Sequence, residues 1–216
     1  MDNQKIIKYG TPVIDGKLDD IYLTSHCVEE KPLEHCYYRP LGEQETIPYM
    51  KNTCAKTYYL HDDEYLYVCA RVHDETLCSR GAEWRMNDKW PWNDDGAEIY
   101  LWFSDKDCMA IHSDAHNIRS VVDEHIWGMH CSAGTYRDTP REDWAATVDE
   151  DNQNYTVELR IKLPDYVKTG SVIGSFAEID DRFAVGEGSE KYVSALCPKN
   201  SNPGAEEHHA ILGPKE

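Results

Sequence analysis

The chain has 216 residues, a length that fits one all-β domain with a buried core. Its 40 acidic and 22 basic side chains give a net charge of −18, which repels phosphate backbones and anionic lipid surfaces alike. We therefore expect neither nucleic acid nor a membrane as a partner, and no apolar run is long enough to span a bilayer.

Cysteine spacing and the first residues bear on where the protein works. The eight cysteines include no Cys-x-x-Cys pair, so zinc-ribbon spacing is absent. We expect free thiols, with a disulfide framework as the alternative in a secreted protein. Residues 1–5 are polar and lack the apolar segment of a signal peptide. The chain as written is expected to be cytoplasmic, or extracellular if a leader has been removed.

Three segments alternate apolar and polar residues, with the period of two that is typical of a β-strand with one buried face. Their apolar positions, in chain order, are Leu66, Val68, Ala70 and Val72; Ala97, Ile99, Leu101 and Phe103; and Tyr155, Val157, Leu159, Ile161 and Leu163. Pro164 ends the third strand because proline cannot donate to a ladder.

Clusters of acidic, amide and glycine residues around these strands predict turns at residues 61–64, 93–96, 104–107, 149–152 and 186–189. No stretch has the apolar spacing of a long amphipathic helix. We therefore predict an all-β fold, an antiparallel β-sandwich of jelly-roll type with short helices only. With no linker or internal repeat, residues 1–216 are expected to form a single domain.

The stretch from Trp92 to Glu98 has the most informative chemistry. An aromatic ring stands six residues before a carboxylate, with acidic and amide side chains between them. A flat ring stacks on the C–H groups of a sugar, while such side chains bind its hydroxyls. Trp92 follows a proline in a polar turn, a poor place to bury an indole, although a core tryptophan is the alternative. Trp90 in the same turn could exchange roles with it.

Glu98 shares its predicted strand face with Tyr100 and Trp102. That face is both aromatic and polar, as sugar-binding sheets are. A contact between Glu98 and a ligand and a plain solvated glutamate are the two alternatives.

Several short motifs follow one another along the chain. Residues 12–20 read Pro-Val-Ile-Asp-Gly-Lys-Leu-Asp-Asp, and residues 62–68 read Asp-Asp-Glu-Tyr-Leu-Tyr-Val, followed by Val72-His73-Asp74. Residues 92–101 read W-x-x-D-x-x-E-I-x-L. Residues 155–161 read Y-T-V-E-x-x-I, residues 170–174 read G-x-x-I-G, and Asp180-Asp181 follows. From about residue 12 to residue 213, the chain resembles the carbohydrate-binding modules of family 9, a DOMON-like β-sandwich family.

Members of that family hold the end of a glycan between two tryptophans, with charged and amide groups on its hydroxyls. The resemblance implies Trp92 as one wall, Glu98 as a hydroxyl acceptor and Arg119 as a donor. With Trp90, Asp95 and Tyr192, these residues make up the predicted ligand-binding set.

The second tryptophan of the family has no counterpart here. It should fall within residues 192–198, where this chain offers Ala195 or Leu196. Either Tyr192 substitutes for it from nearby, or half of the clamp is lost and the ligand differs.

The expected function is non-catalytic binding of a mono- or oligosaccharide, by a free-standing protein or by a module of a glycoside hydrolase. The competing hypothesis is a glycan-active catalytic domain, with Glu98 and Asp95 or Asp123 as an acid/base pair. A third is a haem-binding relative that uses Met86, Met109 or Met129 with a histidine.

Two groups of side chains bear on metal binding. His112, His116, His125 and His130 fall within nineteen positions, before Cys131, without a diagnostic spacing, and are expected to be solvated loop histidines. Acidic turns such as Asp105 with Asp107, or Asp62 with Asp63, offer the hard oxygen ligands that calcium prefers, although a plain acidic turn is the alternative. We expect no required cofactor, with structural calcium as the one candidate.

Overall fold

The computed structural model describes residues 5–30, 53–75, 77, 95–115, 119–122, 125–126, 129–130, 143–184, 191–196 and 202–215. In these ranges the regular elements are strands and two short 3-10 helices. They are β1 (Ile6–Tyr9), η1 (Asp20–Thr24), β2 (Cys27–Glu30), β3 (Cys54–His61), β4 (Tyr65–His73), β5 (Gly96–Ser104), β6 (Asp107–Asp114), β7 (Arg119–Val122), β8 (His125–Ile126), β9 (Met129–His130), β10 (Trp144–Val148), β11 (Asn154–Lys162), β12 (Val172–Ala184), β13 (Lys191–Leu196), η6 (Glu206–His208) and β14 (His209–Leu212). No helix in the described part of the chain has the length and apolar character needed to cross a membrane.

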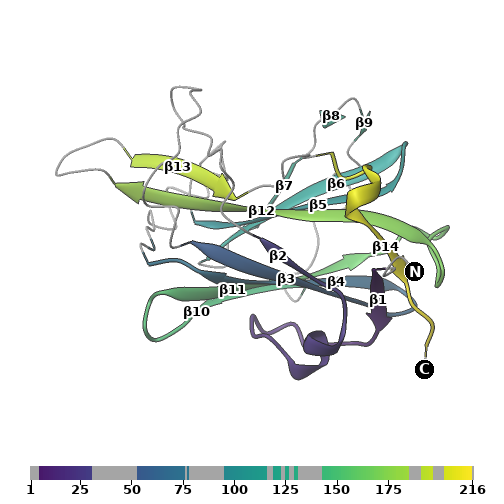
Figure 1. Ribbon diagram of the computed structural model, residues 1–216, viewed down its shortest axis with the longest axis horizontal. Helices are drawn as coiled ribbons and strands as arrows, with labels where there is room; N and C mark the ends of the chain where they lie inside the picture. The colour runs from purple at the N-terminus through teal and green to yellow at the C-terminus, as the bar shows by residue number, and fades with distance from the viewer. Residues whose placement is uncertain are drawn as a thin grey trace.

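Twelve of the strands form one continuous sheet that folds over into two layers (Figure 1). The first layer has the order β10-β11-β4-β3-β1, with β2 also paired to β3. The second has the order β14-β12-β5-β6-β7, with β13 also paired to β12. Strand β1 joins the layers, because it pairs with β3 on one side and with β14 on the other.

The predicted all-β class with short helices is confirmed. The antiparallel prediction holds for the described pairings except at β1, which runs parallel to both of its neighbours. Because β1 and β14 keep the pairing continuous, the sheet is nearly closed and does not separate into two independent sheets. The sandwich and jelly-roll details remain predictions.

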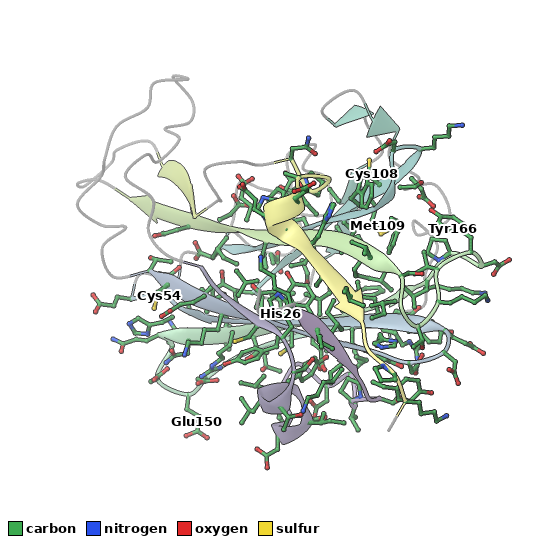
Figure 2. All side chains as sticks on the ribbon, turned by 45° about the vertical axis from the view of Figure 1, so that its right-hand side comes forward. His26, Cys54, Cys108, Met109, Glu150 and Tyr166 are labelled. Atoms are coloured by element: carbon green, nitrogen blue, oxygen red, sulfur yellow. The ribbon has the colours of Figure 1, made fainter. Side chains whose placement is uncertain are left out.

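The main core lies between the layers, where side chains from both fill the space (Figure 2). The apolar faces predicted for β4, β5 and β11 all contribute to it. Hydrogen bonds between described residues cross the core, among them the bond from the Tyr155 hydroxyl to the Gly96 carbonyl at 3.2 Å and the bond from the Ser175 hydroxyl to the Tyr59 hydroxyl at 3.1 Å. They satisfy polar groups that would be costly to bury alone.

The other face of β3, β4 and β11 is buried as well, so the prediction of one solvated face is wrong there. The chain from residue 10 to η1 crosses this face, and a second apolar cluster forms beneath it. Its buried members are Tyr22, Tyr58, Leu60, Tyr67 and Cys69.

Glu158 fixes this crossing segment, which contains the Ile-Asp-Gly motif. One of its carboxylate oxygens accepts the N–H groups of Asp15 and Gly16 at 3.0 and 3.1 Å, and the other accepts the Tyr22 hydroxyl at 3.0 Å. Gly16 has a φ of 78°, a left-handed conformation that favours glycine. The motif therefore has a structural role in joining the opening segment to β11.

Candidate functional site

The candidate site lies on the outer face of β5, which we define by the residues that alternate with its core positions. In chain order they are Gly96, Glu98, Tyr100 and Trp102. Residues directly opposite one another in an antiparallel pair share a face of the sheet. The strand register therefore identifies the residues of the neighbouring strands that lie on the same face. On β12 their partners are Asp180, Glu178, Phe176 and Gly174, and on β6 they are Asp114, His112, Ala110 and Cys108.

Glu98 is at the centre of this face and is only 5% exposed. Its direct neighbours are Glu178 on β12 and His112 on β6. Burial, and then the charges of Glu98 and Glu178, raise the pKa of Tyr100, whose side chain hydrogen-bonds Glu98. Glu98 is thus a buried carboxylate on a polar part of the sheet, which excludes the alternative of a solvated strand glutamate.

His112 lies in strand β6 and is 1% exposed, so the expectation of a solvated loop histidine is wrong for it. Burial lowers its pKa to about 3, which keeps the ring neutral. A Cβ at Gly96 would lie 2.7 Å from His112 Nε2, so the glycine leaves room for the ring to lie over β5. The same nitrogen lies 3.5 Å from Asp180 Oδ2.

The far end of the outer face is covered by the chain's own C-terminal segment, residues 202–209. Trp102 stacks on His209 with ring centroids 5.1 Å apart, and Tyr100 stacks on Phe176 at 4.7 Å. A Cβ at Gly174 would lie 1.9 Å from the Pro203 carbonyl oxygen, so the segment approaches the strand closely. Tyr100 and Trp102 therefore pack against neighbouring rings at this end of the face, and a contact of either ring with a sugar stays a prediction.

Several of the remaining predicted site residues lie outside the part of the chain that the structure describes. They are Trp90, Trp92 and Asp123. Arg119 pairs with Ser113, whose partner on β5 is the core residue Ala97, so the register position of Arg119 is on the face opposite to the row of Glu98, His112 and Ser120. The roles of Trp90, Trp92 and Arg119 stay predictions.

The register of β13 bears on the missing second wall. Ala195 pairs with Asp180 and is therefore at an outer-face position, in the same row as Gly96. Leu196 pairs with the buried Ile179, which belongs to the core face. Tyr192 pairs with Phe183, and its role in the site stays a prediction.

Asp95 lies in a second feature, a buried carboxylate cluster formed with Asp74 and Asp181. One oxygen of each lies within 4.8 Å of the others, and all three side chains are buried. Thr53 donates to Asp181 Oδ2 at 2.7 Å, whereas Asp181 Oδ1 is buried without a hydrogen-bond partner among the described residues. Burial, and then the charge of Asp74, raise the pKa of Asp181 to about 7. Like charges held this close favour either protonation or a bound cation.

One aspartate in each turn that is predicted to bind calcium accepts hydrogen bonds. Asp62 Oδ1 accepts the N–H groups of Glu64 and Tyr65 at 2.8 Å each. Asp107 accepts the Tyr166 hydroxyl at 2.8 Å. Calcium binding at these turns stays a prediction, with a plain acidic turn as the alternative.

The haem hypothesis gains no support from the described residues. Met109 packs in the core between the layers, Met129 lies in β9, and Met86 is outside the described residues. His125 and His130 pair with each other across β8 and β9, while His116 and Cys131 are outside the described residues.

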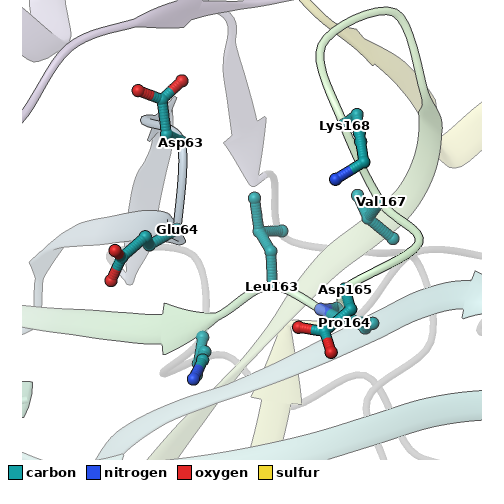
Figure 3. Close-up of a pocket in the computed structure, with 8 residues that line it drawn as sticks. Asp63, Glu64, Leu163, Pro164, Asp165, Val167 and Lys168 are labelled. Carbon is teal, nitrogen blue, oxygen red and sulfur yellow. The ribbon is translucent and has the colours of Figure 1, made fainter.

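A separate pocket of about 330 Å³ lies between the β3–β4 turn and the chain that follows β11 (Figure 3). Carboxylates of Asp63, Glu64 and Asp165 and the amines of Lys162 and Lys168 line it together with apolar side chains. None of the predicted site residues contributes to this pocket, which is distinct from the outer face of β5.

Comparisons with known proteins connect this geometry to a family. The chain is 30% identical to endo-1,4-beta-xylanase A of Thermotoga neapolitana over 176 residues, which are 81% of this chain and 14% of the xylanase. It is 36% identical to endo-1,4-beta-xylanase A of Thermotoga maritima over 94 residues, which are 44% of this chain and 7% of that enzyme. The chain therefore spans only a small part of the curated relatives that it matches.

Two solved structures show the same fold. They are a family 9 carbohydrate-binding module from Caldicellulosiruptor kristjanssonii in complex with cellotriose and the module in complex with glucose. Each superposes with a TM-score of 0.63 at 21% identity and covers 98% of this chain, and this chain covers 94% and 96% of them.

The family described as carbohydrate family 9 binding domain-like matches residues 14–192, which is most of the chain. This range includes the Ile-Asp-Gly segment, strands β2 to β12 and the row of Glu98 and His112. The chain belongs to the family 9 carbohydrate-binding modules.

Proposed function

We propose that the chain is a non-catalytic module that binds the end of a mono- or oligosaccharide at the outer face of β5. Trp92 would supply a stacking wall, and Glu98 would accept hydrogen bonds from hydroxyl groups. Arg119 is the donor that the family resemblance implies, although its register position is in the core-face row of Ala97. Glucose and cellotriose are the ligands of the solved relatives. They are the first candidates here.

The observation that carries the proposal is the position of Glu98. A carboxylate that is 5% exposed on the outer face of a sheet, next to a neutral histidine, is a hydrogen-bonding group held in a nearly dry place. Hydrogen bonds that involve a charged group are stronger than neutral ones, and a dry site strengthens them further. Trp92, six residues earlier in the sequence, supplies the aromatic surface that a sugar needs.

The direct test is calorimetric titration of the chain with glucose, xylose and cellotriose. A small contact with few hydrogen bonds predicts a Kd in the range of roughly micromolar to millimolar. Trp92→Ala and Glu98→Gln should each weaken binding by about tenfold or more. Tyr166→Ala and Glu150→Gln, at exposed positions away from the outer face of β5, are matched controls that should bind like the unaltered chain.

Two outcomes would contradict the proposal. If no sugar binds at millimolar concentration, the module does not bind these saccharides. If sugars bind and both site variants bind as tightly as the controls, the binding surface is elsewhere. Release of product from chromogenic glycosides would instead favour a catalytic domain. The structure groups Asp95 with Asp74 and Asp181, which gives Glu98 no support as half of an Asp95 acid/base pair.

We also propose that a structural calcium ion binds the carboxylate cluster of Asp74, Asp95 and Asp181. The buried Oδ1 atom of Asp181 supports this, because it has no hydrogen-bond partner among the described residues and carboxylate oxygens are the ligands that calcium prefers. An ion there would offset the burial of the Asp181 carboxylate and its repulsion by Asp74, which together raise the pKa of Asp181.

A further inference from the structure

The outer face of β5 holds a polar group that neither the family motifs nor the predicted site residues account for, the imidazole of His112. We propose that His112 is a second ligand-binding residue of the sugar site and determines its specificity. In this role it hydrogen-bonds the hydroxyl next to the one that Glu98 accepts. This inference rests on the proposed function and names the class of ligand, a saccharide end with two adjacent free hydroxyl groups.

The strand register places His112 for this role. His112 and Glu98 are directly opposite each other in the β5–β6 pair, and such residues have their Cβ atoms about 4.5–5.5 Å apart on one face. The carboxylate and the imidazole therefore stand side by side. Neighbouring hydroxyls of one sugar ring are the ligand groups that match two adjacent protein groups.

Gly96 determines the direction of the ring. Because a Cβ at this position would lie 2.7 Å from His112 Nε2, only glycine leaves the space that the imidazole occupies. The ring thus extends over β5 toward Asp180 and comes within 3.5 Å of Asp180 Oδ2. A hydroxyl that His112 binds would have Glu98 on one side and Asp180 on the other.

The hydrogen-bonding state of the ring points to a ligand. Neither nitrogen of His112 has a hydrogen-bond partner among the described residues, although the side chain is 1% exposed. Buried polar groups in folded proteins almost always have partners, so an orphan pair of nitrogens needs an explanation. Burial keeps the ring neutral, so one nitrogen donates and the other accepts, as hydroxyl recognition requires. A sugar reaches the ring only if the atoms that cover it move, which is a common response to binding.

The test pairs a protein variant with modified sugars. The full chain and His112→Phe, which keeps a ring but loses both nitrogens, are titrated by calorimetry with glucose and its monodeoxy analogues. We expect His112→Phe to weaken glucose binding about tenfold. The monodeoxy analogue that lacks the hydroxyl contacted by His112 should bind to the unaltered chain and to His112→Phe with equal affinity. His73→Phe, in the other layer, is the matched control and should leave every affinity unchanged.

The outcomes separate this inference from the proposed function. If Glu98→Gln weakens glucose binding and His112→Phe does not, the role of His112 is wrong and the sugar site stands. If His112→Phe weakens glucose and every analogue by the same factor, the histidine contacts no particular hydroxyl and the inference is overturned. If the unaltered chain binds none of the sugars, both proposals are overturned.

A second measurement covers the case in which His112→Phe does not fold. Nitrogen NMR of the histidine rings is recorded on the His26→Gln variant. This change removes one other histidine, within the described residues, whose pKa burial lowers, to about 4. Glucose should shift the ring signals of a histidine that stays neutral at pH 5. Unchanged signals at saturating glucose would overturn the inference.

Discussion

Ala195 and Leu196 are neighbours in sequence, yet the register assigns them to opposite faces of the sheet. Ala195 pairs with Asp180 in the row that contains Gly96, next to the row of Glu98 and His112. Leu196 pairs with Ile179, which is fully buried in the core. A step of one residue therefore decides whether a new aromatic ring would meet a ligand or the core.

We expect Ala195→Trp to tighten binding of glucose roughly two- to tenfold. A stacked ring contributes about 0.5–1.5 kcal/mol, and 1.4 kcal/mol is a factor of ten. Leu196→Trp should leave the affinity unchanged and lower the free energy of unfolding by about 1–3 kcal/mol, because its register partner Ile179 belongs to the core face, where a larger ring costs packing. Calorimetry and denaturant unfolding measure the two effects. Tighter binding by Leu196→Trp alone would show that the register does not place the second wall.

At the scale of elements, the segment from residue 10 to η1 depends on one buried carboxylate of strand β11. Glu158 is fully buried and accepts hydrogen bonds from the backbone of the Ile-Asp-Gly motif and from Tyr22. Burial is the largest influence on it and raises its pKa to about 7, although its three hydrogen bonds act in the opposite direction. Attachment of this segment to β11 therefore depends on pH.

The sign of this dependence follows from the raised pKa. Between pH 4.5, the ordinary value, and about pH 7, folded Glu158 holds a proton that the unfolded chain releases. Its contribution to stability is thus fully present below pH 4.5 and is lost as the pH rises to 7, by up to about 3 kcal/mol. Unfolding in urea across this range should show the decline. Glu158→Gln should flatten it, and the exposed Glu150→Gln should not. Parallel curves for the unaltered chain and Glu158→Gln would contradict the prediction.

At the scale of the whole molecule, the carboxylate cluster connects the two layers. Asp74 follows β4 in the first layer, Asp95 precedes β5 in the second, and Asp181 lies within β12. Thr53, which donates to Asp181, precedes β3. A cation bound there would hold together strands that are far apart in the sheet order.

We expect calcium to raise the thermal unfolding midpoint and EDTA to lower it. A ligand present at one hundred times its Kd stabilises by about 2.7 kcal/mol, which corresponds to roughly 5–10 °C for a chain of this size. Asp181→Asn should abolish the response without a large loss of stability in EDTA, because it also removes repulsion from Asp74. Asp105→Asn, in the β5–β6 turn, should keep the response. Equal midpoints with calcium and with EDTA would contradict the site.

The sequence predicts the parts of this structure that depend on local periodicity. Alternation identifies the core faces of β4, β5 and β11, because each face is a property of consecutive residues. It does not predict the burial of Glu158, whose partners Asp15 and Gly16 are more than a hundred positions away.

The candidate site likewise contains some residues that the sequence predicts and others that only the structure reveals. The motif at residues 92–101 predicts Glu98 as a site residue. The sequence does not predict the burial of His112, because β6 is buried on both faces and its residues show no clear apolar and polar alternation. The Asp-Asp pair at residues 180 and 181 is visible in the sequence. Only the sheet, however, assigns one residue of the pair to the outer face and the other to the cluster between the layers.

Strands β1 and β14 give the molecule a particular mechanical character. They run parallel, and the N–H groups of Ile211 and Gly213 donate to the carbonyls of Lys5 and Ile7 at 2.9 and 2.8 Å. A stretching force between residues 5 and 215 pulls β1 and β14 in opposite directions along their common axis. The hydrogen bonds of this pair are therefore loaded in shear, all at the same time, whereas a hairpin pulled from its open end breaks them one after another. The strand pair that joins the two layers is thus oriented to resist tension along the chain.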